Sequence, residues 1–325
     1  MLPHQPLFSG NVNDLNGYYP EAINLLALLK RFGLDRYLSN PSSSASRLIT
    51  EKVGFGILIA IASLTIIPIL AVVILIVIKG APALSIEFIS GFPSNGMRSG
   101  GILPAIIGTF YLTIGTALFS VPLGIGAAIY LSEYAPENRW TRLIRIAIIN
   151  LAGIPSVVYG LFGLGLFVIF LNFGTSILAG SLTLSIMTLP VIISTTEEAL
   201  RAVPQSFRVV SISLGGTRWQ TIWRIVLPQA LPGILTGVIL GLERAAGETA
   251  PILFTAAAFF LPKLSSSPMD ATMALPYHLF VISTQVPGMP VTIQYGTALV
   301  LLIFVLSMNI VATVIRSRAR SRRQW

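Results

Sequence analysis

The chain has 325 residues, of which 54% are hydrophobic and only 10% carry a charge. This composition is typical of integral membrane proteins and excludes an ordinary soluble domain. Cysteine is absent, which excludes disulfides and cysteine-ligated metal clusters. The net charge of +9 does not indicate nucleic-acid binding, because the basic residues are scattered between apolar runs rather than gathered on one domain.

Six apolar runs are long enough to cross a bilayer, since about twenty apolar residues span its hydrocarbon layer. We therefore predict an all-α polytopic membrane protein with about six transmembrane helices. The predicted spans are 53–78, 102–131, 146–171, 177–193, 233–261 and 296–315. The fourth is the shortest, and the fifth is the only one with buried charge. Proline is expected to kink the first span at Pro68, and residues 153–155 interrupt the third near its start.

The positions of Lys and Arg predict the orientation, since short cytoplasmic loops hold an excess of these residues. Most of the 21 basic residues precede the first span, follow the sixth, or lie in the second and fourth loops. Both termini are therefore expected in the cytoplasm. Residues 1–50 are predicted to be a cytoplasmic N-terminal extension, in which 21–37 is either a surface helix or loosely ordered, and 51–325 the transmembrane domain.

A further apolar stretch, ALPYHLFVIST, lies within residues 269–294, a segment too short and too polar to span the membrane. We predict a helix that dips into the outer face of the protein. His278 belongs to this stretch. Because no catalytic or metal-ligating partner is evident nearby, we interpret it as a structural histidine whose hydrogen bonds are satisfied.

Two charged residues of the fifth span, Arg244 and Glu248, are the first candidates for a functional site. Arg244 lies about twelve residues into the predicted span, or about 18 Å at 1.5 Å per residue, which is close to mid-bilayer. A charge there costs roughly 2.5–3.5 kcal/mol and indicates function by default. Glu248 lies on the same helical face and can pair with Arg244, whereas Glu243 points elsewhere. A pair that merely fixes helix packing is the alternative.

A long cytoplasmic loop, residues 197–232, separates the fourth and fifth spans. It is compatible with helices, with a break at Gly215 and Gly216 and a stop at Pro228. Such a loop is either a docking element or a simple connector. The chain lacks the Gly-x-x-x-x-Gly-Lys-Ser/Thr motif that cradles nucleotide phosphates. We therefore expect that the chain itself has no ATPase site and no cofactor, and that any ATP is bound by a partner.

The loop sequence EALRAVPQSFRVVSISLGGTRWQTIWRIVLPQALPGI resembles the coupling loop of binding-protein-dependent ABC permeases. The family pattern is Glu-Ala-Ala, three residues, Gly, nine residues, and Ile-x-Leu-Pro. The resemblance implies that the following residues couple the chain to a separate ATPase: Arg208, Leu214, Gly215, Gly216, Trp219, Ile225, Leu227 and Pro228. The chain departs from the pattern at Val209, Val210 and Ser211, which replace Glu-Ala-Ala, so the carboxylate usually offered to the ATPase is missing. Glu197 and Glu198 lie too far upstream to replace it.

Five more motifs, in one order, resemble phosphate-specific ABC permeases of the PstA type over about residues 91–315. They are SGGILPAIIGT, AGIPSVVYGLFG, TTEEALRAVP, RAAGETAPILFTA and MALPYHLF. The resemblance implies a type I ABC importer permease fold in the bacterial inner membrane, with Arg244, Glu248 and Thr249 on the translocation path. The implied partners are a PstC-like second permease, a PstB-like ATP-binding dimer, a periplasmic phosphate-binding protein and membrane lipid, with no nucleic acid.

The charges of Glu243, Arg244 and Glu248 sum to −1, a poor cage for phosphate, so selectivity is expected to come from the binding protein. From the residues alone, an ABC importer of another oxyanion, molybdate or sulfate, stays open. An ion-gradient-driven carrier with Glu248 as a proton relay is a second alternative, which the long cytoplasmic loop disfavours. An intramembrane enzyme is not supported, because no Asp lies in a predicted span and His278 has no evident partner.

Overall fold

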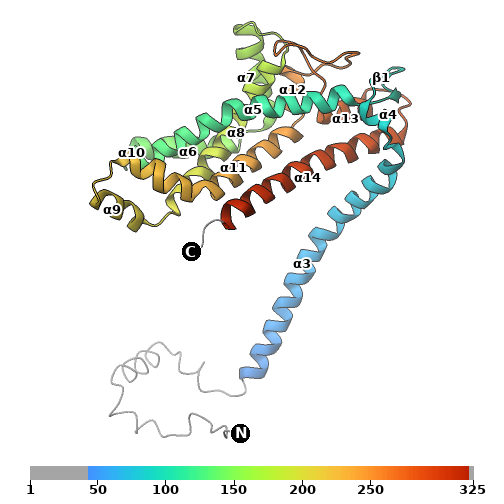
Figure 1. Ribbon diagram of the computed structural model, residues 1–325. Helices are drawn as coiled ribbons and strands as arrows, with labels where there is room; N and C mark the ends of the chain where they lie inside the picture. Colours follow the sequence, from blue (N-terminus) through green and yellow to red (C-terminus); the bar gives the residue numbers. More distant parts are fainter. Residues whose placement is uncertain (1–42, 322–325) are drawn as a thin grey trace, which may run out of the picture. The chain divides into compact units, whose positions relative to one another are not determined.

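The computed structural model describes the backbone of residues 43–321 and the side chains of residues 52–318 (Figure 1). Helices dominate, as predicted, and the named strands of the described residues are one short antiparallel pair, β1 (Pro93–Ser94) and β2 (Ser99–Gly100). The chain divides into two units, Met1–Val72 and Val73–Trp325, with the boundary inside helix α3 (Ser43–Gly80). The prediction for residues 21–37, and most of the predicted N-terminal extension, lie outside the described residues.

Within residues 43–321, five helices are long and apolar enough to cross a membrane, or six crossings result if one bent pair counts as a span. The five are Lys52–Ala83, Leu103–Tyr134, Ile177–Arg201, Arg218–Gly247 and Val291–Arg318. Each overlaps a predicted span. The fourth predicted span is indeed the shortest of these helices, but it runs to Arg201 rather than to residue 193. The prediction ended at residue 193 because the turns that follow are polar and charged, although their backbone stays helical.

The third predicted span is wrong as a straight helix. Helix α6 (Arg139–Ala152) is followed by α7 (Ser156–Gly163), which continues as the π-helical segment η4 (Leu164–Phe170), and the two parts are bent by 101°. The expected break at residues 153–155 is confirmed, since Pro155 has no N–H to continue the ladder of α6. Because α6 begins earlier than residue 146, the break falls in the middle of the pair.

The fifth predicted span is wrong at both ends. The helix is continuous from α10 (Arg218–Thr221) through the π-helical turn η5 (Ile222–Val226) to α11 (Leu227–Gly247). Pro228 does not stop it, because this proline lies at the start of α11, directly after a wide turn in which the regular hydrogen bonds are already shifted. A separate short helix, α12 (Ala250–Thr255), follows. Hydropathy cannot locate the end at Gly247, since the residues beyond it are again mostly apolar.

Helix α8 (Ile177–Arg201) lies at the centre of the second unit. It packs against α5 (Leu103–Ile129) and α11, and α11 packs against α14 (Val291–Ser321) (Figure 1). The contact between α8 and α11 depends on Gly237, where a Cβ atom would overlap the Thr195 hydroxyl. Tight packing of this kind is how helices associate in lipid, where water supplies no driving force.

A helix forms where ALPYHLFVIST predicted one: α13 (Leu275–Thr284). It is buried in the core, with Leu275 and Ile282 fully covered and His278 only 2% exposed. The interpretation of His278 as a satisfied histidine is wrong for one atom, because Nδ1 has no hydrogen-bond partner among the described residues. Burial lowers the pKa of His278 to about 4, since an apolar environment disfavours the charged ring.

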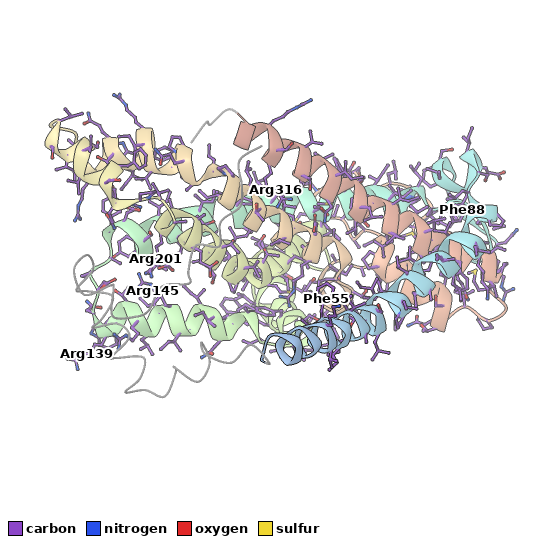
Figure 2. All side chains as sticks on the ribbon, turned by 90° about the horizontal axis from the view of Figure 1, so that it is seen from below. Phe55, Phe88, Arg139, Arg145, Arg201 and Arg316 are labelled. Atoms are coloured by element: carbon purple, nitrogen blue, oxygen red, sulfur yellow. The ribbon has the colours of Figure 1, made fainter. Side chains whose placement is uncertain are left out.

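The two ends of the second unit differ chemically. Figure 2 shows Arg139, Arg145 and Arg201 at one end and Phe88, from helix α4 (Ile86–Ser90), at the other. The start of α8 is covered by the loop before α13, because the backbone N–H of Ile177 donates to Asp270 O at 2.9 Å. The end of α8 leads into helix α9 (Gln205–Ser213). The loop before α13 and the segment that begins with α9 therefore lie at opposite ends of the membrane-spanning helix α8.

Candidate functional site

Helices α9 and α10 form a helical hairpin at the end of α8. The predicted break is confirmed, because Gly215 has φ +86°, a left-handed conformation that glycine adopts without strain. The second helix is capped locally: Thr217 Oγ1 accepts from the Gln220 N–H at 3.2 Å, and Gln220 Oε1 accepts from the Thr217 N–H at 2.9 Å. This reciprocal capping box fixes the start of α10, so the shape of the hairpin is set by its own residues.

The outer surface of the hairpin is apolar. Leu214, at the tip, is 83% exposed. Other large exposed side chains are Val209, Val210, Ile212, Trp219 and Trp223. A hollow of about 450 Å³, lined in part by Val210, Leu214 and Ile225, lies against this surface. Apolar groups gathered in this way on a polar segment mark a site of protein contact.

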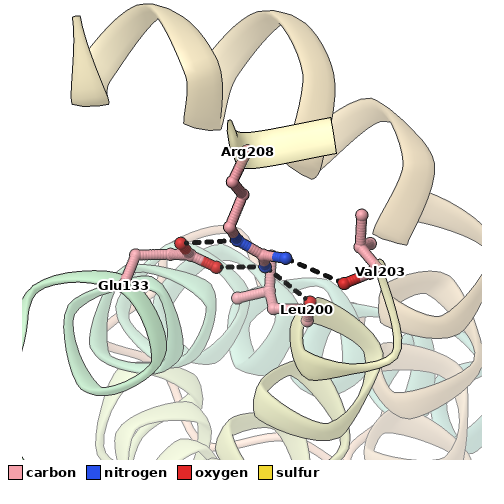
Figure 3. A network of polar contacts seen from close by, with 4 residues as sticks. All are labelled: Glu133, Leu200, Val203 and Arg208. Carbon is pink, nitrogen blue, oxygen red and sulfur yellow. Dashed lines mark hydrogen bonds and ion pairs between the residues drawn. The ribbon is translucent and has the colours of Figure 1, made fainter. Parts of the chain in front are cut away.

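Arg208 points inward from α9, away from that surface (Figure 3). Its Nη2 and Nε donate to Glu133 Oε1 and Oε2 at 2.7 and 3.2 Å. Its Nη1 donates to Val203 O at 2.8 Å, and Nη2 also donates to Leu200 O at 2.9 Å. The two charged side chains are only 13% and 9% exposed. A bidentate, charge-assisted pair of this kind is strong and geometrically specific.

The residues predicted to couple to an ATPase therefore separate into two groups. Leu214, Gly215 and Trp219 are exposed around the tip of the hairpin, with Gly216 partly covered beside them. The others are held partly or largely inside: Arg208, Ile225, Leu227 and Pro228. Sequence reasoning missed Glu133, whose only signal is a lone acidic residue just after the second apolar run. It also missed Trp223, one helical turn after Trp219, with ring centroids 5.2 Å apart.

A second group of charges lies at the same end of the molecule. Glu197 Oε1 is 2.7 Å from Arg145 Nε and 2.8 Å from Arg201 Nη2. Glu197 is thus engaged between α6 and α8 and does not replace the missing carboxylate of α9, as expected. Between these charges and α9 is a cleft of about 510 Å³, lined in part by Arg145, Arg201, Arg208 and Glu133.

Arg244 and Glu248 meet, as predicted, but not in the middle of a helix. Arg244 occupies the last turn of α11, and Glu248 is the capping residue where the helix ends. Arg244 Nε and Glu248 Oε1 are 3.5 Å apart, and the side chains are 40% and 18% exposed. Thr249 precedes α12 at the break between the two helices. This ion pair is loose and partly open, in contrast to the Arg208–Glu133 pair.

Glu243 points elsewhere, as predicted, since its Oε2 accepts from Asn309 Nδ2 on α14 at 3.2 Å. Beside Glu248, a small cavity of about 10 Å³ is lined by Thr109 and Thr113 of α5, among others. That volume has room for about one water molecule. Sequence reasoning missed these threonines, although their spacing of four residues on an apolar span puts both hydroxyls on one face.

Comparison with known proteins places these features in a family. Residues 120–321 match the model of the family described as binding-protein-dependent transport system inner membrane component. The probable ABC transporter permease protein YqgI of Bacillus subtilis is 35% identical over 82% of this chain and 95% of its own length. The probable phosphate transport system permease protein PstA of Methanocaldococcus jannaschii is 34% identical over 80% of this chain and 92% of its own. PstA 1 of Mycobacterium tuberculosis is 35% identical over 70% and 73%.

Solved structures share the fold at low sequence identity. One chain of the MetNI methionine ABC transporter, in an inward-facing conformation, is 17% identical, covers 70% of this chain and 99% of its own, and has a TM-score of 0.55. A chain of the bacterial alginate ABC transporter, solved with its periplasmic protein bound to an alginate pentasaccharide, is 16% identical, covers 81% and 94%, and has a TM-score of 0.60. The predicted architecture of an ABC importer permease is thereby confirmed.

Proposed function

The chain belongs to the binding-protein-dependent transport system inner membrane component family, and we propose that it is the permease subunit of an ATP-driven phosphate importer. The observation that carries this proposal is the similarity to permeases named for phosphate transport over most of the chain. The described helices fit it, since they supply enough membrane crossings for half of a translocation path. Catalysis is left to a separate ATPase that binds the ATP, and this chain holds no cofactor.

The proposed assembly contains a PstC-like second permease, a PstB-like ATPase dimer and a periplasmic phosphate-binding protein, within the lipid of a bacterial inner membrane. Both termini of the chain are proposed to be cytoplasmic. Two features support this orientation. The arginine-rich end of α6 and the α9–α10 hairpin share one end of the second unit (Figure 2), and α14 ends toward the same end (Figure 1).

The α9–α10 hairpin is the proposed contact with the ATPase. It offers Leu214, Trp219 and Val210 to a partner, and the hollow beside them is mainly apolar. Contact through shape and apolar area does not require the family's carboxylate, which Val209 replaces here. Closure of the ATPase dimer would displace the hairpin and, with it, the spans α8 and α11 that carry it, switching the path between outward-open and inward-open forms.

Arg244, Glu248 and Thr249 are the proposed lining of the translocation path. The loose ion pair supports this role, because Arg244 keeps donors available for an anion while Glu248 cancels its charge when no anion is present. A helix broken at this point also leaves irregular backbone inside the membrane domain, which is tolerated where it lines a cavity. Selection of the anion is assigned to the binding protein, since the pair by itself is neutral.

Uptake by the reconstituted transporter tests the proposal. The chain is placed in vesicles with its partner permease and ATPase, and radiolabelled inorganic phosphate is supplied with the binding protein. We expect uptake that requires ATP and the binding protein and that survives dissipation of the proton gradient. Sulfate or molybdate accumulated in preference to phosphate would reject the substrate. Uptake that persists without ATP and collapses with the proton gradient would reject the mechanism.

A further inference from the structure

The Arg208–Glu133 pair lies between the hairpin and the end of α5, and this position gives it a use beyond folding. Resting on the proposed function, we infer that Glu133 is a positioning residue for energy coupling: it ties α9 to α5, so that a displacement of the hairpin by the ATPase moves α5 together with α8 and α11. Arg208 then acts through this internal pair rather than by contact with the ATPase.

The geometry joins α9 to two spans through one side chain. The guanidinium of Arg208 binds the Glu133 carboxylate, which belongs to the π-helical turn η3 (Tyr130–Tyr134) at the end of α5. The same guanidinium binds the carbonyls of Leu200 and Val203, where α8 ends. Nε therefore donates to η3, Nη1 donates to the loop directly after α8, and Nη2 donates to both η3 and α8. Removing Glu133 would leave the link to α8 in place and cut only the link to α5.

The helix α9 is also fastened to α11, through α10. Ser211 Oγ of α9 and Thr221 Oγ1 of α10 are hydrogen-bonded at 2.8 Å, and both residues are buried. The fit is tight, because a Cβ atom on Gly216 would come within 2.9 Å of Ser211 O. Since α10 continues without a break into α11, this bond ties α9 to that span. The hairpin helix is thus held by α5, α8 and α11 together.

The turn η3 extends the linkage to a fourth helix. Arg145 of α6 donates from Nη2 to Leu131 O in η3 at 2.8 Å, while its Nε pairs with Glu197 of α8. A π-helical turn in a helix of this length is unusual and often marks a functional position. Glu133 therefore sits on an element that receives force from α9 and passes it to both α5 and α6.

Stability alone gives a weak reason for such a pair. Replacing a buried ion pair by apolar side chains of similar volume is often neutral or stabilising, whereas a directional pair fixes one geometry. A positioning role and a purely structural role make different predictions. Loss of a positioning contact leaves ATP hydrolysis running without proportionate transport. Loss of a structural contact lowers assembly, hydrolysis and transport together.

The decisive experiment compares phosphate uptake with ATP hydrolysis in the reconstituted complex carrying Glu133→Gln. This variant keeps a hydrogen-bond acceptor but removes the charge. The matched control is Glu137→Gln, because Glu137 lines the same cleft but makes no hydrogen bond or ion pair with the part of the chain that is described. We expect Glu133→Gln to assemble and hydrolyse ATP while phosphate transported per ATP falls about ten-fold or more, with Glu133→Asp intermediate and Glu137→Gln unchanged.

Three results would overturn the inference. They are an unchanged ratio of transport to hydrolysis in Glu133→Gln, a loss of assembly that accounts for all of its defect, and an equal loss in Glu137→Gln. Failure of the proposed function would look different, since the unmodified complex would then show no ATP-dependent phosphate uptake. The two failures are therefore distinguishable in the same set of measurements.

Discussion

The Arg208–Glu133 and Arg244–Glu248 pairs differ in how many hydrogen-bond donors of the arginine are already engaged. Arg208 is covered, and its guanidinium has four hydrogen bonds to Glu133 and two carbonyls. Arg244 is 40% exposed and lies 3.5 Å from Glu248. The first pair is a fastening and the second is an open charge. A pair that fastens helices together therefore leaves few guanidinium donors available, whereas a pair that can bind an anion keeps some of them free.

The largest expected effect belongs to the open pair. Arg244→Ala should lower phosphate uptake at least about thirty-fold, since loss of one charged partner to an anion costs several kcal/mol. Its free energy of unfolding should change by less than about 0.5 kcal/mol, because the pair is loose and partly exposed. Uptake and thermal unfolding of the same preparation check both statements, with Lys263→Ala as a control for lost charge. A large drop in stability would make Arg244 a packing residue instead.

The covered pair should show the reverse pattern in stability. Arg208→Ala leaves the Glu133 carboxylate without a partner in a site where it is only 9% exposed. Breaking a buried pair in this way costs about 3 kcal/mol or more. Chemical unfolding of the detergent-solubilised chain measures it, and Arg218→Ala, which removes another arginine lining the same cleft, should cost far less. Equal costs for the two variants would contradict the assignment of Arg208 as a fastening.

Unlike Arg208 and Arg244, His278 is a buried group without an ionic partner, and its Nδ1 has no hydrogen-bond partner within the described region. Its pKa of about 4 lies below the ordinary value of 6.5, so the unfolded chain binds the proton more readily. The stabilising contribution is then complete above pH 6.5 and is lost as the pH falls toward 4. At pH 5 the loss amounts to about 2 kcal/mol. His278→Gln should flatten the dependence of the unfolding temperature between pH 6.5 and 4, and an unaltered slope would refute it.

The smallest effect concerns the tip of the hairpin. Gly215→Ala should cost about 1 kcal/mol, because a side chain at φ +86° is strained even though open space surrounds it. Gly126→Ala is the matched control, since its Cβ also meets nothing within 4 Å but its backbone is helical, where alanine is favoured by up to about 1 kcal/mol. Thermal unfolding compares them. Equal shifts would mean that Gly215 has no conformational role.

Sequence alone predicted the crossings well and the ends of helices poorly. Hydropathy found the spans because apolar length is a direct requirement of the bilayer. It placed Arg244 inside a continuous helix, whereas Arg244 lies in the last turn of α11. Hydropathy could not show that α11 ends at Gly247, because apolar residues lie on both sides of that end. It also could not show that Arg208 turns inward, since Glu133 is 75 residues away. The resemblance identified the hairpin by Gly215 and Pro228. Only the packing shows that its tip at Leu214 is exposed while Arg208 is covered.

The side of the membrane on which the hairpin lies decides whether the hairpin can contact a cytoplasmic ATPase. The chain has no cysteine, so Leu214→Cys and Met269→Cys, both at exposed positions, each carry a single thiol at opposite ends of α8. We predict that a membrane-impermeant maleimide labels Met269→Cys in intact cells and Leu214→Cys only in inside-out vesicles. In those vesicles, bound ATPase should protect Leu214→Cys and removal of the ATPase should expose it. Labelling of Leu214→Cys from outside intact cells would contradict the coupling role of the hairpin.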